Sequence, residues 1–458
     1  MEAYNLQITL LISLIQANAN FMFAKILNNP LLIQSLWSII ARFVGVGLNF
    51  SVAILITRQL PKSEAGILFL LMTFVTGFAL FSRVGIDQLL MKEVASAHED
   101  EQSFRSSYLR STYKFVALLS VIFSIIWIVA SPWIRNYFFD GEINLNDLMF
   151  AGIGILFFNF VILNSTYLKA IQNTIIAVLS QNALPAITFL IILALFWNSF
   201  KSNQLYINLY TSSLVLAGLI AITLTKKHLS IKDEKKSQGP HFKSLLGKAI
   251  PLAPVSIFSF LMIFADTIMV GLYLPNGDVA LYSVAAKVSF IILFFLGALE
   301  ATIYPRLLNI YKQQPTQLKS FFWQSTALVL GVVLTVTTVM YLLSDWILFV
   351  FGESYTEAKQ ALGLLLIAQF LRAASITFSF MFIIREKVRY LNIILVLALI
   401  INLVCNVIFI QKYGIEGAAL ATLISNGVLL FSVLALFMTN KLLTTLTVPT
   451  KNTQGDKT

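Results

Sequence analysis

Residues 60–68 read LPKSEAGIL and residues 274–282 read LPNGDVALY, and each stretch is a polar corner between two long apolar runs. In both corners proline follows leucine directly, and an acid, Glu64 or Asp278, follows the proline three residues later. Proline is disfavoured inside a helix, and a carboxylate near a helix N-terminus is stabilised by the helix dipole. Each corner therefore predicts the end of one helix and the start of the next.

Apolar runs like those around the corners extend along the whole chain. Of its 458 residues, 58% are hydrophobic and only 12% are charged, about half the charged fraction of a typical soluble chain. The mean hydropathy is +0.83. Runs of about 18 or more apolar residues can cross the ~30 Å hydrocarbon layer as helices. Continuous apolarity, rather than alternation with a period of two, argues against a transmembrane β-barrel. The fold class predicted is an all-α membrane protein.

The sequence predicts about twelve transmembrane helices, which are divided by a basic linker into two parallel six-helix lobes. The predicted spans lie near 35–57, 66–86, 113–132, 148–169, 175–197, 205–225, 250–273, 279–301, 321–343, 359–384, 390–411 and 416–440. An even number of spans per lobe makes the repeat parallel rather than inverted, and the two corners then fall at the same place in each lobe. We therefore expect the lobes to derive from a duplication. The predicted domains are residues 1–34 (cytoplasmic or interfacial), 35–225 (N-lobe), 226–249 (linker), 250–440 (C-lobe) and 441–458 (cytoplasmic tail).

Basic residues predict the orientation of the spans. If the N-terminus is placed in the cytoplasm, most lysines and arginines outside the spans fall in inner loops. The outer loops then hold only Arg58, Lys62, Arg135, Lys201, Lys359 and Lys412. This asymmetry predicts that both termini are cytoplasmic. The first thirty residues allow two interpretations, an interfacial helix or a translation start at Met22 instead of Met1.

Several classes of function are disfavoured by the composition. The single cysteine, Cys405, excludes disulfides within one chain and any site with several cysteine ligands. The histidines have no metal-ligand spacing, and no P-loop sequence occurs, so we expect neither a metal nor a cofactor. The lysine-rich segment 226–243 lacks interleaved aromatic residues and lies beside a predicted membrane face. It is therefore interpreted as facing anionic lipid headgroups, not nucleic acid.

Five ionisable residues lie within predicted spans: Arg42, Asp266, Lys287, Glu300 and Arg372. Each would cost ~2.5–3.5 kcal/mol at the centre of a lipid-facing helix, so we expect them to face protein or water. Arg372 lies about halfway along its span, roughly 20 Å from the outer end at ~1.5 Å per residue, too far to reach a headgroup easily.

Pairing and helix geometry give further expectations. Asp266 is expected to pair with Lys287, and Glu300 with Arg306. Arg83 and Asp87 are one helical turn apart and are expected to form an ion pair. Proline predicts a kink at Pro185 and, in the interpretation slightly favoured over hinges, a helix start at Pro251 and Pro254.

Three stretches together resemble the polysaccharide biosynthesis and export proteins, the Wzx-type O-antigen flippases. They are LWSIIARFVGVGLNFSVAILITRQLPKSEAGILFL (36–70), PLAPVSIFSFLMIFADTIMVGLYLPNGDVALYSVAAKVSFIILFFLGALEATIYPRLLNIYK (251–312), and FGESYTEAKQALGLLLIAQFLRAAS (351–375) with YGIEGAALATLISNGVLLF (413–431). The resemblance covers most of the chain from about residue 30. These proteins belong with MATE transporters and lipid II flippases in the multidrug/oligosaccharidyl-lipid/polysaccharide superfamily.

The resemblance implies a MATE-like V shape and a flippase that moves polyprenyl-diphosphate-linked oligosaccharides to the outer leaflet of the bacterial inner membrane by alternating access. An unpaired diphosphate would be rejected by hydrocarbon, and guanidinium binds phosphate oxygens in a forked geometry. Arg42 and Arg372, one from each lobe, are therefore predicted to hold the diphosphate, with Lys287 as a further cation. Sugars are expected in a hydrated cleft lined by Asn49, Asn159, Asn164 and Gln369.

Energy coupling and partners are less specified by the sequence. Asp266 and Glu300 are the predicted candidates for coupling to a proton or Na⁺, and a gradient of the lipid-linked substrate is the alternative energy source. Besides the lipid-linked substrate, the expected partners are membrane lipids and polysaccharide polymerase or chain-length proteins.

Two other functions compete with the flippase interpretation. A MATE-type cation-coupled drug antiporter would need a cleft dominated by acids, whereas three cations face two acids here. A membrane enzyme such as a glycan polymerase would need a large outer loop with a nucleophile and a base. The outer loops are short and carry no such pair, so we expect no catalysis.

Overall fold

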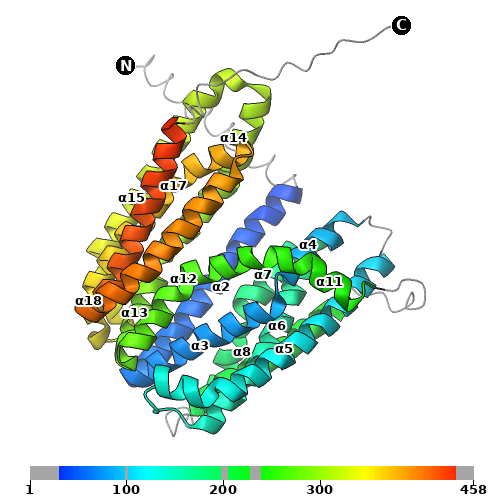
Figure 1. Ribbon diagram of the computed structural model, residues 1–458, viewed down its shortest axis with the longest axis vertical. Helices are drawn as coiled ribbons and strands as arrows, with labels where there is room; N and C mark the ends of the chain where they lie inside the picture. Colours follow the sequence, from blue (N-terminus) through cyan, green and yellow to red (C-terminus); the bar gives the residue numbers. More distant parts are fainter. Residues whose placement is uncertain (1–29, 98–101, 198–204, 227–238, 440–458) are drawn as a thin grey trace, which may run out of the picture. The chain divides into compact units, whose positions relative to one another are not determined.

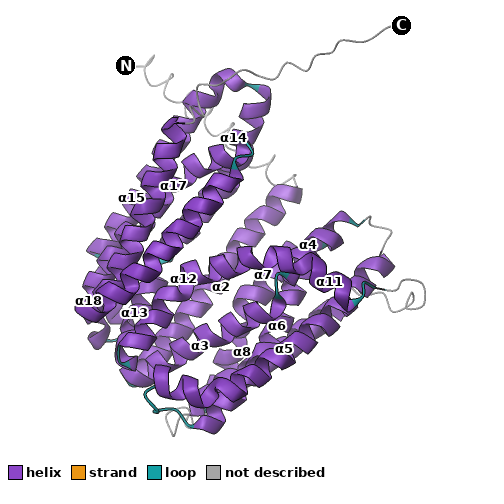
Figure 2. Ribbon diagram, viewed as in Figure 1, coloured by secondary structure: helices purple, strands orange, loops and turns teal. Residues whose placement is uncertain are grey.

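The computed structural model describes residues 30–97, 102–197, 205–226 and 239–439 (Figure 1). Within these residues the chain is helical, with short turns and no strand (Figure 2). Residues 1–29, 227–238 and 440–458 lie outside the described residues, so the predictions for the N-terminal segment, most of the linker and the C-terminal tail stay predictions.

The chain is a multi-pass helical membrane protein. The described residues contain eleven helices long and apolar enough to cross a membrane, several of them built from two consecutive elements. The helices that form them are α2 (Pro30–Gln59), α3 (Lys62–Arg83), α5 (Gln102–Phe138), α6 (Leu145–Ala170), α7 (Thr174–Val178) with α8 (Leu184–Leu195), α10 (Leu205–Lys226), α12 (Ala253–Tyr273), α13 (Asn276–Ser289) with α14 (Ile291–Gln313), α15 (Leu318–Leu342), α17 (Lys359–Ile384) and α18 (Val388–Thr439). Shorter helices are α4 (Ile86–Ser96), α11 (Phe242–Ala249) and α16 (Ser344–Phe351).

The last helix, α18, consists of two segments that meet at Gly414. The backbone there has φ 59° and ψ −135°, a conformation that is neither helical nor accessible to most other residues. The break coincides with the gap between the two predicted spans 390–411 and 416–440. The prediction of about twelve helical spans is therefore confirmed.

The described chain divides into two compact units. Within the described residues, unit 1 comprises 30–52, 78–97, 102–130, 146–197, 205–226 and 239–254, and unit 2 comprises 53–77, 131–145 and 255–439. Helices α2, α3 and α5 each contribute residues to both units, so the boundary does not follow the linker alone.

Both polar corners belong to unit 2, and they pack against each other. Pro61 precedes α3 and Pro275 precedes α13, with Glu64 and Asp278 in the first turns, as predicted. Gly66 lies so close to the start of α13 that a Cβ placed on it would come within 1.7 Å of the Asn276 carbonyl oxygen. Only the hydrogen of glycine fits there, so the two helices approach each other at backbone distance.

In unit 1 the end of the predicted linker is a packed helix. Leu245 and Ala249 of α11 join a buried cluster formed with α4, α5 and α6. The Lys248 ammonium also lies 3.2 Å from a carboxylate oxygen of Glu93 on α4. Gly85, which precedes α4, has φ +77°, and a Cβ there would come within 2.7 Å of the backbone nitrogen of Ala253. Residues 242–249 are therefore held to unit 1 by apolar burial and by one ion pair.

The regular α-helix is interrupted next to both predicted proline positions. A π-helical turn, Leu179–Ala183, separates α7 from α8, and Pro185 lies in the first turn of α8. Proline has no N–H group to donate to the carbonyl four residues earlier, which explains the departure from regular helix at this point. Pro251 lies in a 3₁₀ turn, Ile250–Leu252, directly before α12. The interpretation of Pro251 and Pro254 as a helix start is confirmed.

Candidate functional site

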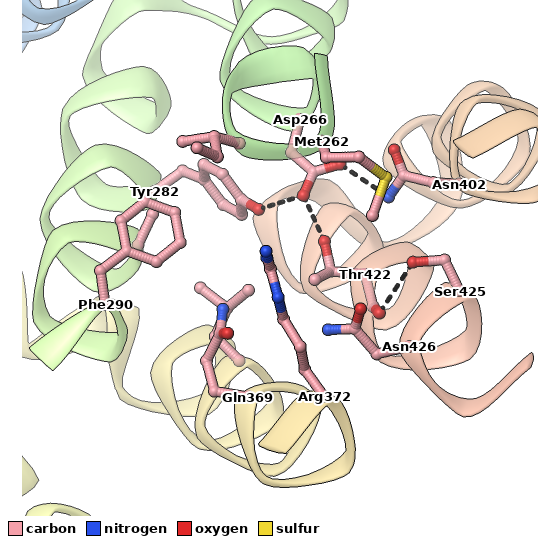
Figure 3. Close-up of a pocket in the computed structure, with 13 residues that line it drawn as sticks. Met262, Asp266, Tyr282, Phe290, Gln369, Arg372, Asn402, Thr422, Ser425 and Asn426 are labelled. Atoms are coloured by element: carbon pink, nitrogen blue, oxygen red, sulfur yellow. Dashed lines mark hydrogen bonds between the residues drawn. The ribbon is translucent and has the colours of Figure 1, made fainter. Parts of the chain in front are cut away.

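Unit 2 contains a small polar cavity lined by helices of its bundle. Figure 3 shows the lining side chains converging from α12, α13, α17 and α18. Apolar side chains such as Met262 and Phe290 form part of the wall. The polar lining consists of Asp266, Tyr282, Gln369, Arg372, Asn402, Thr422, Ser425 and Asn426.

The Asp266 carboxylate accepts hydrogen bonds from four neutral side chains. The Tyr282 hydroxyl donates to its Oδ2 at 2.9 Å, and the Thr422 hydroxyl donates to the same oxygen. Asn402 and Asn406 donate from Nδ2 to Oδ1 at 2.9 and 2.6 Å. A carboxylate has about four lone-pair sites, so these donors satisfy it without a cation. Asp266 thereby connects three helices, α12, α13 and α18.

The Arg372 guanidinium lines the same cavity but has no comparable set of partners. Its side chain extends from α17 toward Tyr282 and Asp266 (Figure 3). Among the described residues, it forms no hydrogen bond or ion pair within bonding distance, although Glu300 on α14 attracts it electrostatically. Guanidinium carries five N–H donors and stays charged in proteins. The cavity therefore presents donors that another group can use.

Gln369 lies one turn before Arg372 on α17 and adds an acceptor to the cavity. Its side chain is only 2% exposed, and its Oε1 atom has no hydrogen-bond partner among the described residues. A buried amide oxygen without a partner costs about 1–3 kcal/mol relative to a satisfied one. Gln369 Oε1 is therefore an acceptor that a bound molecule can use.

Two predicted ion pairs in unit 2 are wrong. Asp266 does not pair with Lys287, because four neutral donors already fill its acceptor sites. The Lys287 ammonium lies 4.8 Å from the centre of the Phe69 ring instead, in a cation–π contact. Glu300 does not pair with Arg306, whose guanidinium lies 5.3 Å from the centre of the Phe321 ring.

In unit 1 the predicted polar residues Arg42 and Asn49 both lie on α2, about two turns apart. Arg42 is exposed on α2. Asn49, two turns further on, donates from Nδ2 to the backbone oxygens of Gly45 and Asn182, both at 2.8 Å. The Asn49 amide therefore links α2 to the π-helical turn, a structural contact that the prediction did not include.

The predicted ion pair between Arg83 and Asp87 is confirmed, at 3.8 Å from Nε to Oδ2. Arg83 also donates to Asn159 Oδ1 at 2.6 Å. Asn159 is fully buried, as is Asn164, which accepts from the Tyr113 hydroxyl. The prediction that these two asparagines line a hydrated cleft is wrong, because both are enclosed within unit 1.

Four residues that surround Asp266 were not predicted from the sequence. Tyr282 ends the second corner sequence, and Thr422, Asn402 and Asn406 lie in apolar spans. The asparagines are four residues apart, which places their side chains on one face of a helix. Two amides with this spacing inside an apolar span indicate a shared polar partner, and this signal was available in the sequence.

Comparison with known families and curated proteins gives a consistent result. The family described as polysaccharide biosynthesis protein matches residues 31–311, more than half of the chain. A protein described as a low-salt glycan biosynthesis flippase, Agl15, from Haloferax volcanii is 23% identical over 400 residues, which cover 85% of this chain and 79% of the relative. A protein described as an O-antigen transporter from Shigella flexneri is 24% identical over 363 residues, which cover 76% and 83%.

Solved structures show the same fold at low sequence identity. An inward closed conformation of the lipid II flippase MurJ superposes with a TM-score of 0.68 at 16% identity, covering 89% of this chain and 87% of that one. An inward-facing multidrug resistance transporter of the MATE family, from the MOP superfamily, gives a TM-score of 0.69 at 15% identity, covering 90% and 100%. The predicted MATE-like fold class is therefore confirmed.

Proposed function

Because the chain belongs to the polysaccharide biosynthesis protein family, we propose that it is a flippase for polyprenyl-diphosphate-linked oligosaccharides. It moves these lipids from the inner to the outer leaflet of the bacterial cytoplasmic membrane for the synthesis of surface polysaccharide, with both of its termini in the cytoplasm. The names of the two curated relatives and the fold shared with a lipid II flippase support this class of cargo. Transport by alternating access involves no covalent step and no cofactor.

One observation carries the choice of an anionic cargo. The unit 2 cavity exposes the Arg372 guanidinium, and none of the described residues lies within ion-pair distance of it. Such a cation is costly inside an apolar helix, and a phosphate group would supply the acceptors that it lacks. Gln369 lies beside Arg372, and its amide can serve the hydroxyl groups of a sugar. Arg42, which is exposed in unit 1, is the other arginine that the sequence prediction assigns to the diphosphate.

Asp266 and Glu300 serve as the ion-sensitive groups in this proposal. Asp266 links three helices of unit 2 through four hydrogen bonds, so a proton or sodium ion arriving at its carboxylate would change all of those contacts. Glu300 attracts Arg372 and thereby connects an acid to the cargo-binding cation. The Lys287 ammonium lies over the Phe69 ring, so we assign it a smaller part in binding the cargo than Arg372.

A second candidate function is cation-coupled export of organic cations, which the similarity to the MATE transporter favours. A cationic drug would need an acid that is free to receive it. The acceptor sites of Asp266 are occupied by neutral donors, and Arg372 in the same cavity would repel a cation. Two assays discriminate between the candidates. A flippase should complement a strain that lacks its O-antigen flippase, whereas a cation antiporter should export ethidium or norfloxacin.

The decisive experiment measures export of repeat units in that strain with the full-length chain. The wild-type protein should restore surface polysaccharide, and Arg372→Ala and Arg42→Ala should each lower export at equal protein levels in the membrane. Arg389→Ala is the matched control, because Arg389 is an exposed arginine at the start of α18, away from the cavity lining. Normal export by both Arg42→Ala and Arg372→Ala would refute the role given to these arginines.

The energy source is tested separately. Asp266→Asn removes the charge while keeping the size of the side chain, and export by this variant should no longer respond to dissipation of the proton or sodium gradient. Collapsing each gradient in turn identifies the ion. If wild-type export survives the loss of both gradients, transport follows the gradient of the lipid-linked substrate and Asp266 has no coupling role.

A further inference from the structure

One face of α2 in unit 1 carries Arg42 between two contacts with the α7–α8 region. Ser38 donates to the Thr174 hydroxyl at 3.1 Å, and Asn49 donates to the Asn182 carbonyl at 2.8 Å. Gly45 packs so closely that a Cβ there would come within 2.6 Å of Asn182 Cβ. Residues 38, 42, 45 and 49 follow helical spacing, so they share this face. Arg42 therefore lies beside the segment that runs from Thr174 to Asn182.

A second cation, Lys169, lies near the end of α6 and close to Arg42. The two like charges are near enough to repel each other. The Lys169 ammonium donates to Gln181 Oε1, which also accepts from Ser165 Oγ at 3.2 Å. The ammonium group has three N–H donors, and a neutral amide occupies one of them. The fold thus orients Lys169 without neutralising it.

The π-helical turn at Leu179–Ala183 holds both cation-bearing helices. Gln181 contacts α6 through Lys169 and Ser165, whereas the next residue, Asn182, contacts α2 through Gly45 and Asn49. Turns of this kind are rare and frequently occur at functional sites. Two consecutive residues of the turn therefore fix the helices that carry the two positive charges.

The charge balance around these cations is positive. Asp87 is the acid that attracts Lys169, and it already lies 3.8 Å from Arg83. Arg42 has no hydrogen-bond or ion-pair partner among the described residues, which leave out residues 1–29. Bringing two cations together in membrane-spanning segments is costly unless an anion offsets the repulsion.

We propose that Arg42 and Lys169 form an anion-binding subsite in unit 1 for the diphosphate group of the lipid-linked cargo, with Gln181 as the residue that positions Lys169. The identity of the lipid rests on the proposed function, whereas the preference for a diphosphate follows from two adjacent cations. Lys169 therefore contacts a phosphate oxygen directly, and Gln181 acts through Lys169.

Binding to the purified full-length protein in detergent tests the subsite, with farnesyl diphosphate and inorganic diphosphate as probes and farnesol as the uncharged control. Lys169→Gln should weaken binding of both diphosphates about tenfold or more, the usual size of a lost hydrogen bond to a charged group. Lys114→Gln removes the same charge from an exposed position on α5 and should leave affinity unchanged. Equal loss in the two variants, or no loss in Lys169→Gln, overturns the proposal.

The positioning role of Gln181 has its own test. Gln181→Glu places a carboxylate beside Lys169 and should weaken diphosphate binding as much as Lys169→Gln does, while the melting temperature stays the same or rises. In the double variant the two effects should not add, because both remove the same free positive charge. Additive losses, or a fall in melting temperature that accounts for the weaker binding, would contradict this role.

Two further comparisons identify the source of the anion and distinguish failure of the subsite from failure of the proposed function. Nanodiscs with and without phosphatidylglycerol distinguish a phospholipid headgroup, and a Lys169 effect confined to phosphatidylglycerol overturns the assignment to diphosphate. If Lys169 controls diphosphate binding but the chain never restores export, the proposed function fails and the subsite stands. If export is restored and Lys169→Gln binds diphosphate like the wild type, the subsite fails alone.

Discussion

Two arginines in apolar helices have opposite surroundings in the two units. Arg83 in unit 1 is 5% exposed, donates to Asn159 and pairs with Asp87. Arg372 in unit 2 borders a cavity and has no such partner among the described residues. The fold provides hydrogen-bond and ion-pair partners for Arg83 but, within the described residues, none for Arg372. A charged residue within a span therefore indicates function only when the structure gives it no ion-pair or hydrogen-bond partner.

The largest expected effect separates these two arginines by stability. Arg83→Leu takes the ion-pair partner from the partly buried Asp87 and a donor from the buried Asn159, which should lower the free energy of unfolding by ~3 kcal/mol. Arg372→Leu removes a cation that no bonded partner depends on, so its cost should stay under about 1 kcal/mol. Denaturant unfolding of the purified protein in detergent measures both. Equal destabilisation by the two substitutions would show that Arg372 is also structural, which would contradict the contrast between the two arginines.

A smaller effect is expected from the buried amides beside the arginines. Asn159 donates to Ser82 and Ser120, both at 2.7 Å, and accepts from Arg83. Asn159→Leu should therefore cost about 1–3 kcal/mol by leaving these partners unsatisfied. Gln369→Leu removes an amide whose oxygen has no partner, so stability should stay near the wild-type value.

Both amide variants are to be unfolded side by side, and repeat-unit export is to be measured in the same strains. Loss of export without loss of stability in Gln369→Leu would sharpen the contrast between the closed cluster of unit 1 and the open cavity of unit 2. A Gln369 variant as unstable as Asn159→Leu would instead indicate that the cavity is held together by its amide.

The smallest effect is expected at a surface ion pair, which provides the baseline for the comparison. The Lys62 ammonium lies 2.9 Å from Glu357, with the side chains 34% and 60% exposed. Exposed pairs contribute ~0–1 kcal/mol, so Lys62→Ala should barely change unfolding. Raising the salt concentration should make the wild type and the variant indistinguishable. A cost comparable to that of Arg83→Leu would mean that charge pairs stabilise this protein regardless of burial.

The sequence predicted the helices well because their causes are local. Long apolar runs, the prolines at 61 and 275, and the acids that follow them determine where helices begin and end, and the structure confirms these positions. The pair formed by Arg83 and Asp87 was predictable for the same reason, since one helical turn separates them.

Partners from distant spans could not be predicted from the sequence. Asp266 is satisfied by Tyr282, Asn402, Asn406 and Thr422, which lie up to 156 residues away in the chain. Charge alone favoured Lys287 as its partner, but packing places that ammonium over an aromatic ring. Opposite charges can be paired by their sign alone, whereas the neutral donors that contact a carboxylate can be identified only when the rotation and register of the helices are known.

If the two lobes derive from a duplication, as the sequence predicts, the contact between the two corners bears on how the chain changed afterwards. When the corner sequences are aligned, Gly66 and Ala280 occupy the same position, and a Cβ on Gly66 would lie 3.1 Å from the Ala280 backbone nitrogen. In an ancestral dimer of identical half-chains, this position would meet its own counterpart, so every enlargement would occur twice. Once the halves are joined in one gene, the two positions mutate independently. Position 280 can then gain the methyl group of alanine while position 66 remains glycine.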